Sequence, residues 1–123
     1  MTTGRLDAVR ASLRVAATDV ERDAAIGAWL QLSAMAEPPG RRAIICEGVL
    51  FDRTGPQGVP LVGLGAGCPC CTGLVALRVA LGRTLRSRRP EAVLLLVASA
   101  EHLARLRRLL ADGELGVRFD VEA

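Results

Sequence analysis

Lysine is absent from this sequence of 123 residues, and all 16 basic residues are arginine. Without lysine the chain can form neither a Schiff base nor a phosphate loop in which a lysine contacts the phosphates. Tyrosine and asparagine are also missing, and the aromatic residues are limited to Trp29, Phe51 and Phe119. This scarcity argues against base stacking, and the arginines form no recognisable nucleic-acid-binding motif, so no nucleic-acid partner is predicted.

Long apolar runs are lacking as well. The longest, Ala92–Ala98, is far shorter than the roughly 20 residues that a membrane-spanning helix needs. The first ten residues contain no apolar run and do not resemble a secretory signal, so neither a membrane nor an export pathway is predicted. Half of the residues are nevertheless apolar, which excludes intrinsic disorder. We therefore expect one folded domain spanning residues 1–123.

Short apolar runs alternate with helical patterns along the chain. Leu6, Val9 and Leu13 have helical spacing, so the first segment is ambiguous between helix and strand. Residues 48–58 are expected to form a loop. The expected strands are Leu13–Ala17, Ala43–Cys46, Val59–Leu64, Ala92–Ala98 and an edge strand Val117–Val121. The expected helices are Val20–Met35 with a cap at Asp19, Gly73–Arg88 with a cap at Thr72, and a segment from Ser99 to about Leu110. This alternation predicts a three-layer α/β sandwich with a mostly parallel sheet.

Three of the four cysteines lie within four residues, in Cys68-Pro69-Cys70-Cys71. The stretch follows a glycine-rich segment and precedes a predicted helix, whose free N–H groups and dipole favour the thiolate form. Thiolates are both metal ligands and nucleophiles, and Cys68 and Cys71 have the spacing of zinc sites and of redox dithiols alike. The softness of sulfur favours zinc or cuprous copper as the metal.

Cys46 and Glu47 end a separate predicted strand. The carboxyl ends of parallel strands share one edge of a sheet, so we expect the cysteine segment to meet one of these two residues there. The predicted metal ligands are Cys68, Cys70 and Cys71, with Glu47 or Cys46 as a further ligand. A lone cysteine such as Cys46 can equally be a small buried apolar residue.

The segment Gly67–Thr72, with the sequence GCPCCT, resembles the GCxCC(T) motif of the CobW-like metallochaperone GTPases, a branch of the P-loop GTPases. The resemblance covers about residues 13–110. Glu47 falls on the glutamate of that family's strand, Cys46 replaces an asparagine, and Asp52 falls near an acidic loop position. The resemblance implies a P-loop-NTPase-like core, zinc as the metal, and a role in metal handling or as a partner of a GTPase or another metalloprotein.

The phosphate loop of that family, GxxGxGKT, falls on residues 17–24, where all three glycines are missing. Asp23 stands in place of the lysine and Ala24 in place of the magnesium-binding threonine. Acidic side chains in this segment would also repel phosphates. The chain is too short for the family's C-terminal domain. We therefore expect a shortened relative that binds no GTP and has no GTPase activity.

Two other functions stay open. The CPxC pattern is also that of glutaredoxin-like dithiols, which predicts a thiol-disulfide oxidoreductase with Cys68 as nucleophile and Cys71 as the resolving thiol. Pro90, the only proline downstream, lies too close to that pattern for the cis-proline loop of such folds. The third function is a non-catalytic interaction domain with inert cysteines. The cysteine cluster suits a reducing cytoplasm, and an exposed strand edge predicts a homodimer.

Overall fold

The computed structural model describes residues 9–33, 40–65 and 74–122. Its helices are α1 (Asp19–Ser33), α2 (Leu74–Arg88) and α3 (Leu103–Asp112). Its strands are β1 (Val9–Val15), β2 (Arg42–Glu47), β3 (Arg53–Thr54), β4 (Pro60–Gly65), β5 (Ala92–Val97) and β6 (Phe119–Val121). The predicted α/β class with a mostly parallel sheet is confirmed.

The strands form one six-stranded sheet in the order β3-β4-β2-β5-β1-β6. Only β3 is antiparallel, because it forms a short hairpin with β4. β5 lies in the middle of the sheet and pairs with β1 along its whole length and with β2 on its other side. All six residues of β5 are buried, which explains why its sequence AVLLLV shows no alternation of polar and apolar residues.

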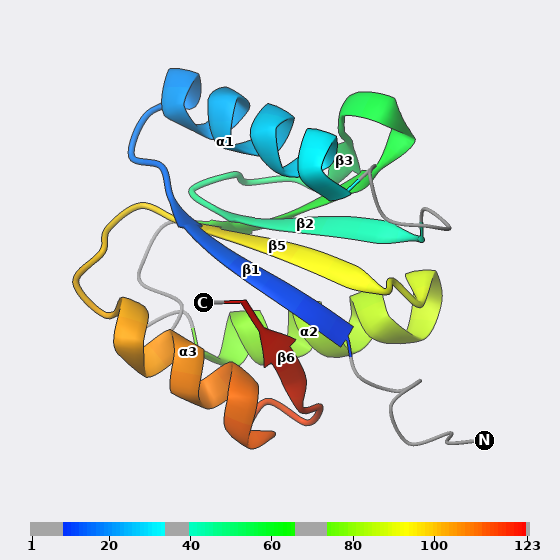
Figure 1. Cartoon of the computed structure of the whole chain (residues 1–123), viewed down its shortest axis with the longest axis vertical. Coiled ribbons are helices and arrows are strands. Elements are labelled where there is room, and N and C mark those ends of the chain that lie inside the picture. The colour runs from blue at the N-terminus through cyan, green and yellow to red at the C-terminus, as the bar shows by residue number, and fades with distance from the viewer. Residues whose placement is uncertain (1–8, 34–39, 66–73, 123) are drawn as a thin grey trace.

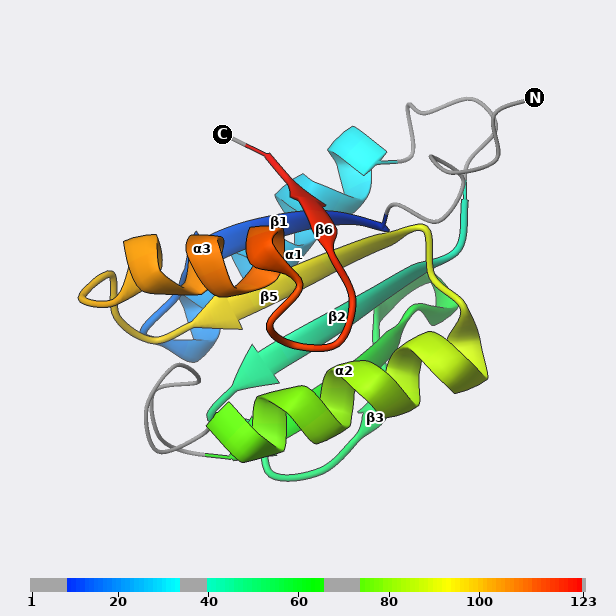
Figure 2. The same cartoon turned by 90° about the horizontal axis from the view of Figure 1, so that it is seen from below.

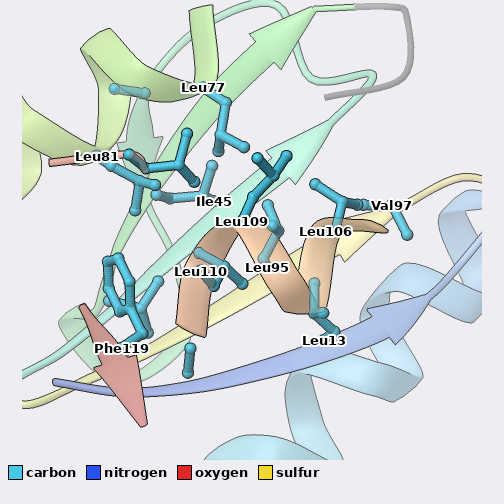
Figure 3. Close-up of a cluster of buried hydrophobic side chains, with 14 of the residues drawn as sticks. Leu13, Ile45, Leu77, Leu81, Leu95, Val97, Leu106, Leu109, Leu110 and Phe119 are labelled. Atoms are coloured by element: carbon cyan, nitrogen blue, oxygen red, sulfur yellow. The ribbon is translucent and has the colours of Figure 1, made fainter. Parts of the chain in front are cut away.

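Helices lie on both faces of the sheet. Figure 1 shows α1 above the strands and both other helices below them. Figure 2 is seen from below, so α2 and α3 lie in front of the sheet in that view. Each face buries its own apolar cluster. One cluster joins Trp29 and Leu30 of α1 to strand residues such as Ile44 and Leu94. The other joins α2 and α3 to the opposite faces of the same strands and includes Leu13, Ile45, Leu77, Leu81, Leu95, Leu106, Leu110 and Phe119, which converge in Figure 3.

The three predicted helices are present. Leu77 and Leu81, one turn apart on α2, are fully buried, and Trp29 of α1 is buried with its indole N–H donating to Ser12 Oγ at 3.2 Å. α3 ends at Gly113, whose φ of 81° is the left-handed conformation that glycine adopts at helix ends. Within the described ranges, no helix is both long and apolar enough to cross a membrane.

Some predicted boundaries were wrong. The first strand is Val9–Val15 instead of Leu13–Ala17. Residues Arg10–Val15 pair with β5, and these backbone hydrogen bonds outweigh the helical spacing of the apolar residues in this segment. Residues 48–58, expected as loop, contain β3 and a 3₁₀ turn at Pro56–Gly58. The last helix was expected to begin at Ser99, but α3 begins at Leu103. The Ser99 hydroxyl oxygen instead accepts the backbone N–H of Glu101 at 3.1 Å, before the helix starts.

Candidate functional site

The carboxyl ends of the parallel strands meet at one edge of the sheet. The N–H of Ala16, just after β1, donates to the carbonyl of Val97 at the end of β5 at 2.8 Å. The N–H of Gly48, just after β2, donates to the carbonyl of Gly65 at the end of β4 at 2.6 Å. From this edge α1 leaves β1 toward one face, whereas α3 leaves β5 toward the other (Figure 1). Such a switch point is where ligands bind in open α/β sheets.

Glu47, the last residue of β2, lies at this edge as predicted. Its side chain is half-buried, and Oε1 accepts the backbone N–H of Ala98 at 3.0 Å. The carboxylate therefore bridges the ends of β2 and β5, and one of its two oxygens is engaged there. Next to it the pairing of β2 with β4 shifts by one residue, since Cys46 pairs with Gly63 but Glu47 with Gly65. Such bulges change the direction of neighbouring side chains.

Cys46 faces away from Glu47. It is 1% exposed and packs in the apolar cluster beneath α1, while its thiol donates weakly to the carbonyl of Glu47 at 3.7 Å. Burial raises the pKa of the Cys46 thiol, although the positive charges of Arg22 and Arg53 lower it in part. The protonated thiol is the form that this environment favours, and a protonated thiol is a poor metal ligand. Of the two further ligands predicted beside the cysteine cluster, Glu47 is therefore the better placed.

At the start of α1, in the segment 17–24 that was compared with a phosphate loop, the free backbone N–H groups bind the side chain of Glu21. Oε1 of Glu21 accepts the backbone N–H groups of Ala17 at 2.8 Å and Thr18 at 3.2 Å, and the Glu21 N–H donates to Thr18 Oγ1 at 3.1 Å. This reciprocal pair is a capping box, so the cap of α1 is Thr18 and not Asp19 as predicted. Asp19 instead pairs with Arg22 at 2.7 Å. The N–H groups that would face an anion here already bind a carboxylate of the chain itself.

Removing this carboxylate is expected to weaken α1. Glu21→Ala leaves the N–H groups of Ala17 and Thr18 to water and should lower the free energy of unfolding by about 1 kcal/mol. Glu21→Gln keeps an acceptor oxygen and should lose about half as much. Urea unfolding followed by circular dichroism measures both variants. Two variants as stable as the parent chain would contradict the capping role.

Asp52 has a structural role that the sequence did not reveal. Its Oδ1 accepts the N–H of Gly63 on the outer side of β4 at 3.0 Å, and its Oδ2 pairs with Arg83 of α2 at 3.1 Å. A side chain at position 63 would lie 2.2 Å from the carbonyl oxygen of Val49, so only glycine permits this close approach. Asp52 thus joins the edge of the sheet to α2 and is not free to serve as a ligand at the carboxyl edge.

Cys68, Cys70 and Cys71 lie outside the described residues. The segment that carries them begins directly after Gly65, which is hydrogen-bonded to the two residues that follow Glu47: its carbonyl accepts the Gly48 N–H, and its own N–H donates to the carbonyl of Val49 at 3.0 Å. Among residues 9–33, 40–65 and 74–122, no three histidine, cysteine, aspartate or glutamate side chains are grouped so that they could hold a metal ion.

Comparisons of the chain with protein-family models, with curated proteins and with solved structures find no match.

Proposed function

We propose that this chain is a metal-binding α/β protein that binds zinc through the thiolates of Cys68, Cys70 and Cys71, with Glu47 as a further oxygen ligand. In this proposal the fold is a P-loop-NTPase-like core of the CobW type whose phosphate loop is inactive. The protein handles metal, or serves a GTPase or another metalloprotein as a non-catalytic partner, in the reducing cytoplasm. Cys46 belongs to the ligand set only if its buried thiol is displaced.

One observation carries the proposal: the end of β2, with Glu47, is paired with the end of β4, from which the cysteine segment departs. Glu47 pairs with Gly65 in the sheet, and Cys68 follows Gly65 by three residues. A chain extends by at most about 3.6 Å per residue, so the Cα atoms of Cys68 and Gly65 are no more than about 11 Å apart. This limit, which follows from chain geometry alone, supports a site shared by Glu47 and the first thiol of the cluster. Three thiolates and one carboxylate are a donor set that zinc accepts.

The absence of nucleotide binding is supported by the capping box of α1. A phosphate at this helix N-terminus would have to displace the Glu21 carboxylate from the Ala17 and Thr18 N–H groups. It would also approach Asp19 and Asp23, whose charges repel it. We expect calorimetric titration with GTP and magnesium to give no saturable binding in the micromolar range. A micromolar isotherm would contradict the proposed loss of nucleotide binding.

The metal proposal is tested by metal content and free-thiol count on one untagged sample, purified under reducing conditions without chelator. We expect about one zinc per chain, or per dimer, and thiols that react slowly until a chelator is added. Cys46 supplies an internal reference, because a thiol that is 1% exposed should react slowly with or without chelator.

Other results would select the alternatives. A metal-free sample with one fast-reacting thiol and a reversible Cys68–Cys71 disulfide would overturn the metal proposal in favour of a thiol-disulfide oxidoreductase. A metal-free sample with four slow thiols would leave an interaction domain.

Analytical ultracentrifugation of the same sample tests the homodimer. In the described sheet β6 pairs only with Val9–Ala11 of β1. The rest of β1, up to Val15, therefore has an edge that is open to pairing with a second copy of the chain.

A further inference from the structure

A pocket of about 340 Å³ lies between the end of α1 and the strands β1 and β6. It includes the beginning of β1 and the first residue of β5, so it is separate from the carboxyl edge of the sheet where Glu47 lies. We call it the Trp29 pocket. The lining residues on which the following argument depends are Arg10, Ser12, Trp29, Leu32, Asp120 and Glu122.

The pleat of the two strands turns polar side chains toward this pocket. Ala11 of β1 and Phe119 of β6 pack in the apolar cluster with α2 and α3. Successive residues of a strand point to opposite faces, so Arg10, Ser12 and Asp120 point to the other face, on which α1 lies. The pocket therefore has a polar floor next to the apolar cluster beneath α1.

A buried hydroxyl and an indole form the inner part of the pocket. Ser12 is 6% exposed, and its Oγ accepts the indole N–H of Trp29 at 3.2 Å. In the part of the chain that the structure describes, the Ser12 hydroxyl donates to no other residue, so its hydrogen is available to an acceptor in the pocket. The hydroxyl of Ser33, at the rim, is already engaged, because it donates to a carbonyl of α1 and accepts from Arg42.

One positive and one negative side chain line the pocket without a counter-ion. Arg10 and Asp120 are direct neighbours in the ladder between β1 and β6, and both are exposed. Neither side chain has a hydrogen bond or ion pair to another of the described residues. Glu122, the third charged residue of the lining, differs because its carboxylate pairs with Arg14. The charges that are open to a ligand are thus balanced.

We propose that the Trp29 pocket binds a free α-amino acid with an apolar side chain. The ligand's carboxylate pairs with the Arg10 guanidinium and its ammonium group with the Asp120 carboxylate. Neighbouring strands lie about 4.8 Å apart, and an α-amino acid carries both charges on one carbon, so a single molecule can contact both side chains. The apolar side chain lies against Trp29 and Leu32, which is 62% exposed without a ligand. The volume is within the roughly 300–1,000 Å³ of small-molecule sites.

The proposal can be tested on the parent chain, because Trp29 is its only tryptophan and it contains no tyrosine. Indole fluorescence therefore reports on this pocket alone. Titration with L-leucine should give a saturable change with a Kd below about 1 mM. Isoamylamine lacks the carboxylate and isocaproate lacks the ammonium group, so each should bind at least about tenfold more weakly than leucine.

A pair of variants locates the ligand. The pocket variant is Arg10→Gln with Asp120→Asn, which removes both charged contacts and should weaken leucine binding at least about tenfold. The control is Arg105→Gln with Asp112→Asn, two exposed residues of α3 whose replacement makes the same change in charge. The control should bind leucine within about twofold of the parent chain.

Three results would overturn the proposal. The first is the absence of saturable leucine binding both in fluorescence and in equilibrium dialysis with radiolabelled leucine. The second is equal binding of leucine and either analogue, which would mean that the pocket attracts apolar molecules without recognising an amino acid. The third is equal weakening in the two variants, which would place the ligand elsewhere. The comparison of ligands uses the parent chain, so it decides the question even if the pocket variant is less stable.

Discussion

Replacing Cys68, Cys70 and Cys71 together by serine is expected to reduce bound zinc from about one ion per chain to none. Serine hydroxyl groups stay protonated at neutral pH and cannot replace thiolates as ligands. If the metal also stabilises the fold, the free energy of unfolding should fall by several kcal/mol. Metal analysis and urea unfolding on the same preparations measure the two effects. Unchanged zinc content in the triple variant would contradict the proposed site.

Cys46→Ala is the matched control, because it removes a thiol from the same protein at a position packed beneath α1. It should retain the full zinc content and lose about 1 kcal/mol of stability from its buried site. Glu47→Gln should weaken zinc binding while still accepting the N–H of Ala98 through its amide oxygen. Loss of zinc in Cys46→Ala comparable to the triple variant would instead make Cys46 a ligand and require its side chain to leave the α1 cluster.

Leu94→Ala is expected to cost about 3 kcal/mol of unfolding free energy. Leu94 is fully buried at the centre of β5, where it pairs with Ser12 of β1 on one side and Ile44 of β2 on the other. Removal of its side chain opens a cavity at the junction of three strands, beneath α1. Against a typical stability of about 5–15 kcal/mol for a small domain, this is a large loss. Chemical unfolding followed by circular dichroism gives the value.

Val79→Ala provides the comparison for that measurement. Val79 is 57% exposed on α2, so the same type of truncation should change the unfolding free energy by less than about 0.5 kcal/mol. A loss below about 1 kcal/mol for Leu94→Ala would mean that β5 is not the tightly packed centre of the sheet.

The alternation of strands and helices could be predicted from the sequence because burial leaves a local pattern. The continuous apolar run of residues 92–98 predicts a strand, and all six residues of β5 are buried. The order of strands could not be predicted in this way. β5 enters the sheet between β1 and β2, which are consecutive in the chain, and no local periodicity records such an insertion.

The candidate site was only partly predictable for a related reason. The sequence predicts Glu47 or Cys46 as the further ligand, yet adjacent residues of a strand point to opposite faces, so the period of two already separates them. The spacing of Thr18 and Glu21 is that of a capping box, and the prediction of Asp19 as the cap overlooks it.

The central position of β5 also constrains how the protein forms during synthesis. In the described sheet β1 and β2 have no ladder with each other and are joined through β5, whose residues 92–97 are translated after β1, β2 and β4. A nascent chain that ends before residue 92 can form the β2–β4 pair but cannot attach β1 to it. The native sheet therefore closes late, when β5 has left the ribosome and inserts between β1 and the β2–β4 pair. Until then the apolar faces of both segments lack the strand that joins them, so we expect the interval before β5 emerges to be prone to aggregation.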